Sequence, residues 1–351
     1  MLPLTEKPPA SARGVRHFFR AYGLNLSADA PVPGLREDPS HSGRPDVVMN
    51  FGAEPPWVRE AMRLSPRVDC LRAQAEGEDS LFKLTSLGEG AFFQLAYGDG
   101  TRFIVDGAAT RLWETWRPTL TPEDAATYLL GPVMGFVLRR RGVMALHASS
   151  VAVSDRAVVL CGPSESGKST TAAALALRGI PVLAEDVAPI KEDKGSLYVE
   201  PGYPRVCLWP DVVETLFGVP GAMPQITPTW EKCFLPLDGG RAKFESKKRP
   251  LGVIYVFAPR VDEVDAPRIE DLGMREALLG LVQNTYMNWL LSRKQRAEEL
   301  DALTKLVARV PVRRIVPHAD PQHLGALCEL IMKDAEHSWG RQTLAGVSSG
   351  S

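Results

Sequence analysis

The sequence lacks several features that would place it in a specialised class of protein. Its 351 residues carry a formal net charge of −1, so no global basic field would attract nucleic acid or an anionic membrane. The five cysteines are scattered, odd in number and form no C-x-x-C pair, which predicts reduced thiols in a cytoplasmic protein and argues against a zinc site. No apolar stretch follows a basic start, so a signal peptide is not expected.

The chain also has no long hydrophobic run. The strongly apolar stretch near Leu129–Leu138 contains Pro132 and ends in three arginines, so it is too short to cross a bilayer, and we expect no membrane partner. There is no internal repeat. What remains is an ordinary globular composition, 44% hydrophobic and 24% charged, over a length that suits one large domain or two smaller ones.

The most informative segment is a glycine-containing run that fits the pattern G-x-x-x-x-G-K-[ST] of phosphate-binding loops. Its residues are Gly162, Pro163, Ser164, Glu165, Ser166, Gly167, Lys168, Ser169 and Thr170. An apolar run at 157–161 predicts a buried strand before it, and an alanine-rich run at 169–178 predicts a helix after it. This strand–loop–helix context is the one the motif requires, and it argues against a chance match.

Each fixed position of the pattern has a physical reason. Gly162 and Gly167 can take backbone angles that a side chain would forbid, so that the loop N–H groups and the helix N-terminus can point at anionic oxygens. The ammonium of Lys168 adds a charge between the outer phosphates, and the hydroxyl of Ser169 is placed to bind Mg²⁺. The sequence therefore predicts ATP and Mg²⁺ as cofactors.

Five more polar residues are candidates for the surroundings of the phosphate. Glu185 and Asp186 follow the strand predicted after the loop helix, where one carboxylate could hold Mg²⁺ and the other accept a proton, or both could form a solvated turn. His147 on an earlier strand is either functional or a satisfied core histidine. Glu200 and Arg205 could serve metal and phosphate or make an ordinary surface pair.

The pattern along the chain predicts four regions. Residues 1–45 are rich in proline, serine and charge, which predicts an irregular or partly disordered leader. Residues 46–120 alternate as a small antiparallel β-rich unit, and 121–336 form the phosphate-binding domain. Residues 337–351 are expected to be a disordered tail.

Within the large domain the apolar periodicity predicts a series of elements. Strands are expected at 144–153, 157–161, 180–183, 252–257 and 312–316, with a hairpin across Lys194-Gly195. Helices are expected from 121 towards 141 with a kink at Pro132, at 211–217, at 274–307 with a break near Arg293, and at 322–333.

Taken together, these residues resemble the catalytic domain of HPr kinase/phosphorylase and its diverged relatives. The matching features are the run from His147 to Val153, the loop at the family's spacing, the acidic pair and Glu200. The resemblance covers about 146–216 well. The segments around 129–131, 146–149 and 200–204 are closer to the HPr-kinase-like proteins of peptide-maturation clusters, including lasso-peptide kinases.

The resemblance implies an α/β fold, namely a P-loop kinase domain of the HPr kinase/PEP carboxykinase type with a mixed sheet. It implies ATP at the loop, metal at Ser169 and Asp186 with support from Glu200, and His147 beside the reacting phosphate. The family's acidic pair begins with an aspartate that acts as the base, and here that position is Glu185. The family's glycine-arginine segment is altered around Arg205, whose assignment as a nucleotide contact follows that segment.

The resulting hypothesis is an ATP- and Mg²⁺-dependent kinase that phosphorylates a hydroxyl, in particular a serine of a peptide or protein. Lys168 and the metal would offset charge on the transferred group, and Glu185 or Asp186 would receive the serine proton. A small-molecule kinase and an ATP-binding regulatory module without turnover are the alternatives. Assembly into a homo-oligomer stays open.

Overall fold

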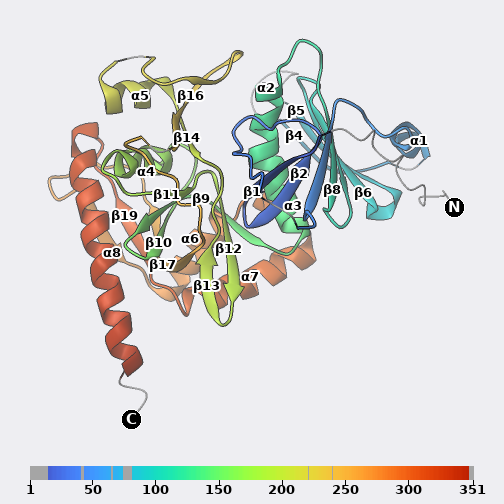
Figure 1. The fold of residues 1–351 in the computed structure, drawn as a ribbon. Coiled ribbons are helices and arrows are strands. Elements are labelled where there is room, and N and C mark those ends of the chain that lie inside the picture. Colours follow the sequence, from blue (N-terminus) through green and yellow to red (C-terminus); the bar gives the residue numbers. More distant parts are fainter. Residues whose placement is uncertain are drawn as a thin grey trace. The chain divides into compact units, whose positions relative to one another are not determined.

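The computed structural model describes residues 15–40, 43–64, 66–73, 81–219, 221–238 and 240–347 (Figure 1). The chain divides into two compact units. The first consists of Met1–Arg20 and Leu24–Thr119, and the second of Ala21–Gly23 and Leu120–Ser351. No helix within the described residues combines the length and the apolar character needed to cross a membrane.

The first unit is an eight-stranded sheet with the order β1-β2-β3-β8-β7-β6-β5-β4. Its elements are β1 (His17–Ala21), β2 (Leu24–Ala28), β3 (Val47–Phe51), α1 (Trp57–Leu64), β4 (Arg67–Ala73), β5 (Leu81–Leu87), η2 (Gly88–Gly90), β6 (Phe92–Tyr97), β7 (Arg102–Asp106) and β8 (Arg111–Thr115). The strands from β4 to β8 pair antiparallel, as the alternating sequence predicts, but β3 lies parallel to both β2 and β8. The predicted antiparallel unit is therefore a mixed sheet.

The prediction of an irregular leader over 1–45 is wrong where the structure describes it. Residues 17–28 form β1 and β2, and their inward side chains, including Phe19 and Leu26, are buried. The prolines that suggested irregular structure lie after these strands, in the connection to β3. Residues 1–14 of the leader lie outside the described part of the chain.

The second unit contains a mixed eight-stranded sheet with the order β10-β9-β12-β13-β17-β19-β18, and β11 pairs with β9. Its strands are β9 (Met144–Val153), β10 (Arg156–Cys161), β11 (Val182–Ala184), β12 (Val187–Asp193), β13 (Ser196–Val199), β17 (Arg249–Phe257), β18 (Arg268–Asp271) and β19 (Val312–Val316). The neighbours β10, β17 and β19 run parallel, whereas β9 runs antiparallel to β10. This arrangement confirms the predicted mixed α/β class.

Helices and a small third sheet complete the second unit. The helices are α2 (Pro122–Tyr128), η3 (Leu129–Val133), α3 (Met134–Arg140), α4 (Lys168–Leu177), α5 (Pro210–Phe217), α6 (Met274–Gln283), η4 (Asn288–Leu290), α7 (Arg293–Val307), η5 (Pro321–His323) and α8 (Leu324–Val347). The third sheet has the order β14-β16-β15, formed by β14 (Arg205–Leu208), β15 (Gln225–Thr227) and β16 (Trp230–Pro236).

Two predictions about helices are confirmed, and the prediction of a disordered tail is wrong where the structure describes it. The helix starting at Thr121 is interrupted around Pro132 by the π-type turn η3, because proline has no N–H for the helical ladder. The segment 274–307 is broken between α6 and α7. The tail expected to be disordered from residue 337 is instead helical in its backbone as far as Val347, as part of α8. Residues 348–351 lie outside the described part of the chain.

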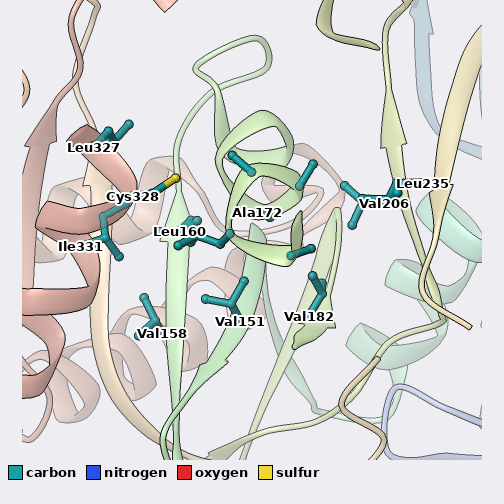
Figure 2. Packing of buried hydrophobic residues seen from close by; sticks show 14 of the residues in the cluster. Val151, Val158, Leu160, Ala172, Val182, Val206, Leu235, Leu327, Cys328 and Ile331 are labelled. Atoms are coloured by element: carbon teal, nitrogen blue, oxygen red, sulfur yellow. The ribbon is translucent and has the colours of Figure 1, made fainter. Parts of the chain in front are cut away.

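The two faces of β10 explain why its sequence is apolar at every position from 157 to 161. Val158 and Leu160 pack on one face with residues of α4 and α8, among them Ala172 and Ile331 (Figure 2). The alternate residues of the strand belong to a second cluster on the other face, which includes Leu281 of α6 and Leu303 of α7. A strand covered on both faces reads as a continuous hydrophobic run.

Leu160→Ala tests this packing. Leu160 is fully buried, so the truncation removes apolar contacts and leaves a cavity, and we expect the free energy of unfolding to fall by about 2–5 kcal/mol. The measurement is urea unfolding followed by circular dichroism. Val264→Ala, at a fully exposed position, is the control and should change the stability by less than about 0.5 kcal/mol. Equal stability of the two variants would contradict the two-sided burial of β10.

Candidate functional site

The sheet brings the loop and the acidic pair to one edge. Both β10 and β11 pair antiparallel with β9, so they run in the same direction and end at the same side of the sheet. The loop follows Cys161 at the end of β10, and Glu185-Asp186 follow Ala184 at the end of β11. Ligands of open α/β sheets bind outside such strand ends.

The loop needs glycine at its first and sixth positions. A Cβ atom on Gly162 would lie 2.5 Å from Oγ of Ser166, whose side chain occupies that space. Gly167 has a φ of +103° and is the residue before the first turn of α4. Among the described residues, no side chain caps this helix, which leaves its first N–H groups facing the loop. Such a helix N-terminus favours an anion.

Lys168 begins α4 and is almost completely buried. Its Nζ donates a hydrogen bond to the carbonyl oxygen of Pro163 at 2.7 Å, so the ammonium folds over its own loop. Burial lowers the pKa of Lys168, while the negative charges of Asp186 and Glu185 act in the opposite direction. A positive charge in this position faces the same space as the helix N-terminus.

Glu185 contacts the loop helix directly. The hydroxyl of Ser169 donates a hydrogen bond to Oε1 of Glu185 at 2.8 Å. Glu185 is only 4% exposed, and this burial, together with the charge of Asp186, raises the pKa of its carboxyl group. A further cation next to Glu185 would oppose the effects of burial and of the Asp186 charge, and would lower this pKa again.

Asp186 turns away from Ser169 and towards a different pair of side chains. Its φ of +63° lies in the left-handed region, which directs its side chain differently from that of Glu185. His147 Nε2 lies 3.3 Å from one carboxylate oxygen, and the hydroxyl of Tyr286 donates to the other at 2.8 Å. Burial opposes ionisation, but the hydrogen bonds and charge of these partners prevail and lower the pKa of Asp186.

Tyr286 was not found by sequence reasoning, because it lies in the interruption of the segment predicted as a helix at 274–307. Two glycines create the space for its ring. A Cβ on Gly135 would overlap Cε1 of Tyr286, and a Cβ on Gly131 would lie 3.5 Å from its hydroxyl and 3.4 Å from Oδ2 of Asp186. The glycines of the segment 131–135 are therefore the signal that a large side chain packs against this helix.

Lys232 is a second residue that sequence reasoning missed, since no strand was predicted at 230–236. Its Nζ lies 5.5 Å from the ring centroid of Trp209 and 5.5 Å from that of Trp230. Burial and other contacts have the larger effects on the pKa values of the acidic pair, and the charge of Lys232 acts to lower both. Lys232 thus adds a third cationic or hydrogen-bonding group to the surroundings of Lys168 and His147.

The remaining two candidates, Glu200 and Arg205, make other contacts. The side chain of Glu200 fills the space above Gly23, where a Cβ would lie 2.5 Å from Cδ of the glutamate. The guanidinium of Arg205 lies 4.1 Å from the ring centroid of Phe234, and burial lowers the pKa of Arg205. These are the contacts that the structure gives the two side chains, and their roles at the metal and the phosphate stay predictions.

The donor set at the loop suits a magnesium ion that is shared with phosphate. Ser169 and Glu185 supply hard oxygen atoms, with Asp186 next in the chain. Within the described residues, no group of three or more histidine, cysteine, aspartate or glutamate side chains could hold a metal by itself. Mg²⁺ commonly takes one or two carboxylates and completes its shell with water and substrate phosphates, so the residues present fit this ion.

Comparison with known proteins gives little further information. No protein-family model matches the chain, and no curated protein matches it in sequence. The solved structures similar to it include that of the Hpr(Ser) kinase/phosphatase from Coxiella burnetii, at 15% sequence identity and a TM-score of 0.32, over 58% of this chain and 97% of that chain.

The Tyr286 hydrogen bond gives a test that needs no substrate. Because this bond favours the ionised carboxylate, Tyr286→Phe should raise the pKa of Asp186. A tenfold fall in the acid dissociation constant would mean that the charged form has lost about 1.4 kcal/mol of stabilisation. The measurement is a ¹³C NMR titration of aspartate carboxyl groups, with Asp186→Asn to identify the resonance. An unchanged titration in Tyr286→Phe would contradict the arrangement.

Proposed function

We propose that this protein is a Mg²⁺- and ATP-dependent kinase that transfers the γ-phosphoryl group to a hydroxyl, in particular a serine of a peptide or protein. The observation that carries the proposal is the hydrogen bond between Ser169 and Glu185, next to Asp186. It joins the start of the helix after the glycine loop to an acidic pair. Phosphoryl transfer needs these same elements, namely donors for the phosphates, oxygen ligands for a metal and a base.

The position of each residue suggests its role in the transfer. The loop N–H groups and Lys168 would bind the outer phosphates, and Ser169 with Glu185 would hold Mg²⁺, which when bound offsets the negative charge of the phosphate oxygens. Glu185 suits this role because it is buried against Ser169, and burial together with the charge of Asp186 raises the pKa of its carboxyl group, which a bound cation would lower again. The family resemblance assigns the metal to Asp186 instead, so the geometry favours the reverse division of the pair.

Asp186 suits the role of base. Its side chain is 36% exposed, so an acceptor hydroxyl can reach it from solvent, while His147 and Tyr286 fix its orientation. In the transfer, the acceptor oxygen forms a bond to the γ-phosphorus and the bond from that phosphorus to the bridging oxygen of ADP breaks. The proton of the acceptor hydroxyl passes to the carboxylate of Asp186.

The first test is phosphate transfer from radiolabelled ATP to an arrayed library of serine peptides, with ATP binding measured by calorimetry. Lys168→Ala should lower the rate of transfer by about 10²–10³-fold, because it removes a charge from the phosphate site. Lys247→Ala, at an exposed lysine outside the site, is the matched control and should behave as wild type. Equal rates for the two variants would refute the kinase proposal. Binding of ATP without transfer to any acceptor would indicate a regulatory module instead.

The proposed roles of Glu185 as metal ligand and Asp186 as base have their own test. Glu185→Gln should raise the Mg²⁺ concentration needed for half-maximal rate, since it weakens a metal ligand. Asp186→Asn should lower kcat by about 10²–10⁴-fold at saturating Mg²⁺, without a change in the Mg²⁺ requirement. Rates measured across a Mg²⁺ series separate the two effects. The opposite pattern would restore the assignment that the family resemblance implies.

A further inference from the structure

A pocket opens beside the loop, and Ser166 and Gly167 of the loop line it. It encloses about 130 Å³ and is lined by residues of the loop helix, of α5 and of the segments that follow β17 and β19, among them Thr170, Val212, Phe257, Arg260, His318 and His323. This volume is less than the roughly 300–1,000 Å³ of a site that takes a whole drug-sized ligand. It has room for one ring system.

The topology explains why the pocket adjoins the loop. Because β10, β17 and β19 run parallel, their carboxyl ends lie at one edge, with Cys161 beside Val256 and Phe257 beside Ile315. The chain after each strand therefore enters the same region. A ligand whose phosphates lie on the loop has this pocket directly next to it, along the start of α4.

The pocket offers flat surfaces. The imidazole rings of His318 and His323 stack with their centroids 3.8 Å apart and their planes at 17°. Phe257, at the end of β17, is 5% exposed and lines the same space, as does Val212 of α5. Planar rings and aliphatic groups are the surfaces on which a nucleobase stacks, since every base has a π-face.

The opening of the pocket towards the loop carries a cation. Nη2 of Arg260 lies 3.4 Å from the carbonyl oxygen of Glu165, to which it donates, and 3.5 Å from where a Cβ of Gly167 would lie. Arg260 lines the pocket together with the loop residues Ser166 and Gly167, so the guanidinium lies where the pocket meets the loop. A ligand that spans the pocket and the loop would have its negative charge near this cation and its uncharged ring inside the pocket.

We propose that this pocket is the base-binding subsite for a purine nucleotide, with the base against the His318–His323 pair and the phosphates on the loop. The proposal rests on the proposed function and adds where the base of the nucleotide binds and which residues select it. The larger purine ring covers more of the stacked surface than a pyrimidine does, so purine nucleotides bind more tightly than pyrimidine nucleotides.

Calorimetric titrations of the full chain with Mg²⁺-ATP, Mg²⁺-CTP and Mg²⁺-tripolyphosphate test the subsite. His323→Ala should weaken ATP binding by roughly 5- to 100-fold, the effect of losing one stacked base, and leave tripolyphosphate binding unchanged. Thr215→Trp, which places a large ring at the exposed edge of the pocket, should have the same pattern. In wild type, ATP should bind more tightly than CTP, and His323→Ala should reduce that difference.

Thr304→Trp is the matched control for the tryptophan. Thr304 is an exposed helical threonine whose hydroxyl donates to the carbonyl oxygen four residues earlier, as that of Thr215 does. It should bind both ligands as wild type. Wild-type ATP affinity in His323→Ala and Thr215→Trp, or equal weakening of ATP and tripolyphosphate, would overturn the subsite. If wild type binds neither ligand, the proposed phosphate site fails, which is a different result.

Discussion

Two adjacent carboxylates beside a buried lysine set the conditions for the rest of this site. A buried charge is costly unless other groups pair with it, and Glu185 and Asp186 would repel each other if both pointed into one space. The backbone avoids this through the left-handed conformation of Asp186, so that one carboxylate meets Ser169 and the other meets His147 and Tyr286. The pair is thereby divided into a carboxyl group whose pKa is raised by burial and a carboxylate whose pKa is lowered by its hydrogen-bond partners.

The different orientations of Glu185 and Asp186 depend on the packing of a helical segment that lies far from them in the sequence. The ring of Tyr286 reaches Asp186 because Gly135 leaves room for it on α3, and the π-type turn around Pro132 places Gly131 next to the same hydroxyl. A side chain at either glycine would displace the ring or the carboxylate. The orientation of one acidic side chain therefore depends on two glycines of an earlier helical segment.

Much of this arrangement follows from local sequence. The parts that do not follow from it share one cause. The glycine loop, its flanking strand and helix, and the acidic pair at the next strand end can be predicted because each is specified by a few neighbouring residues. Tyr286 and Lys232 could not, because their roles arise from chain segments that pack together over long sequence distances. The leader was misread for a related reason: β1 and β2 are stabilised by pairing in a sheet, which overrides the composition around them.

The same reasoning explains why the metal and base roles that we propose differ from those that the family resemblance implies. The sequence shows that Glu185 and Asp186 are neighbours, but it does not show where each side chain points. The left-handed conformation of Asp186 changes the direction of its side chain. A glutamate is also one methylene longer than the aspartate that the family resemblance implies at the first position. That extra length lets Glu185 reach Oγ of Ser169 from the end of β11, whereas the shorter Asp186 stays near His147 on the neighbouring strand β9. The substitution is consistent with a site whose metal ligand and base have exchanged positions.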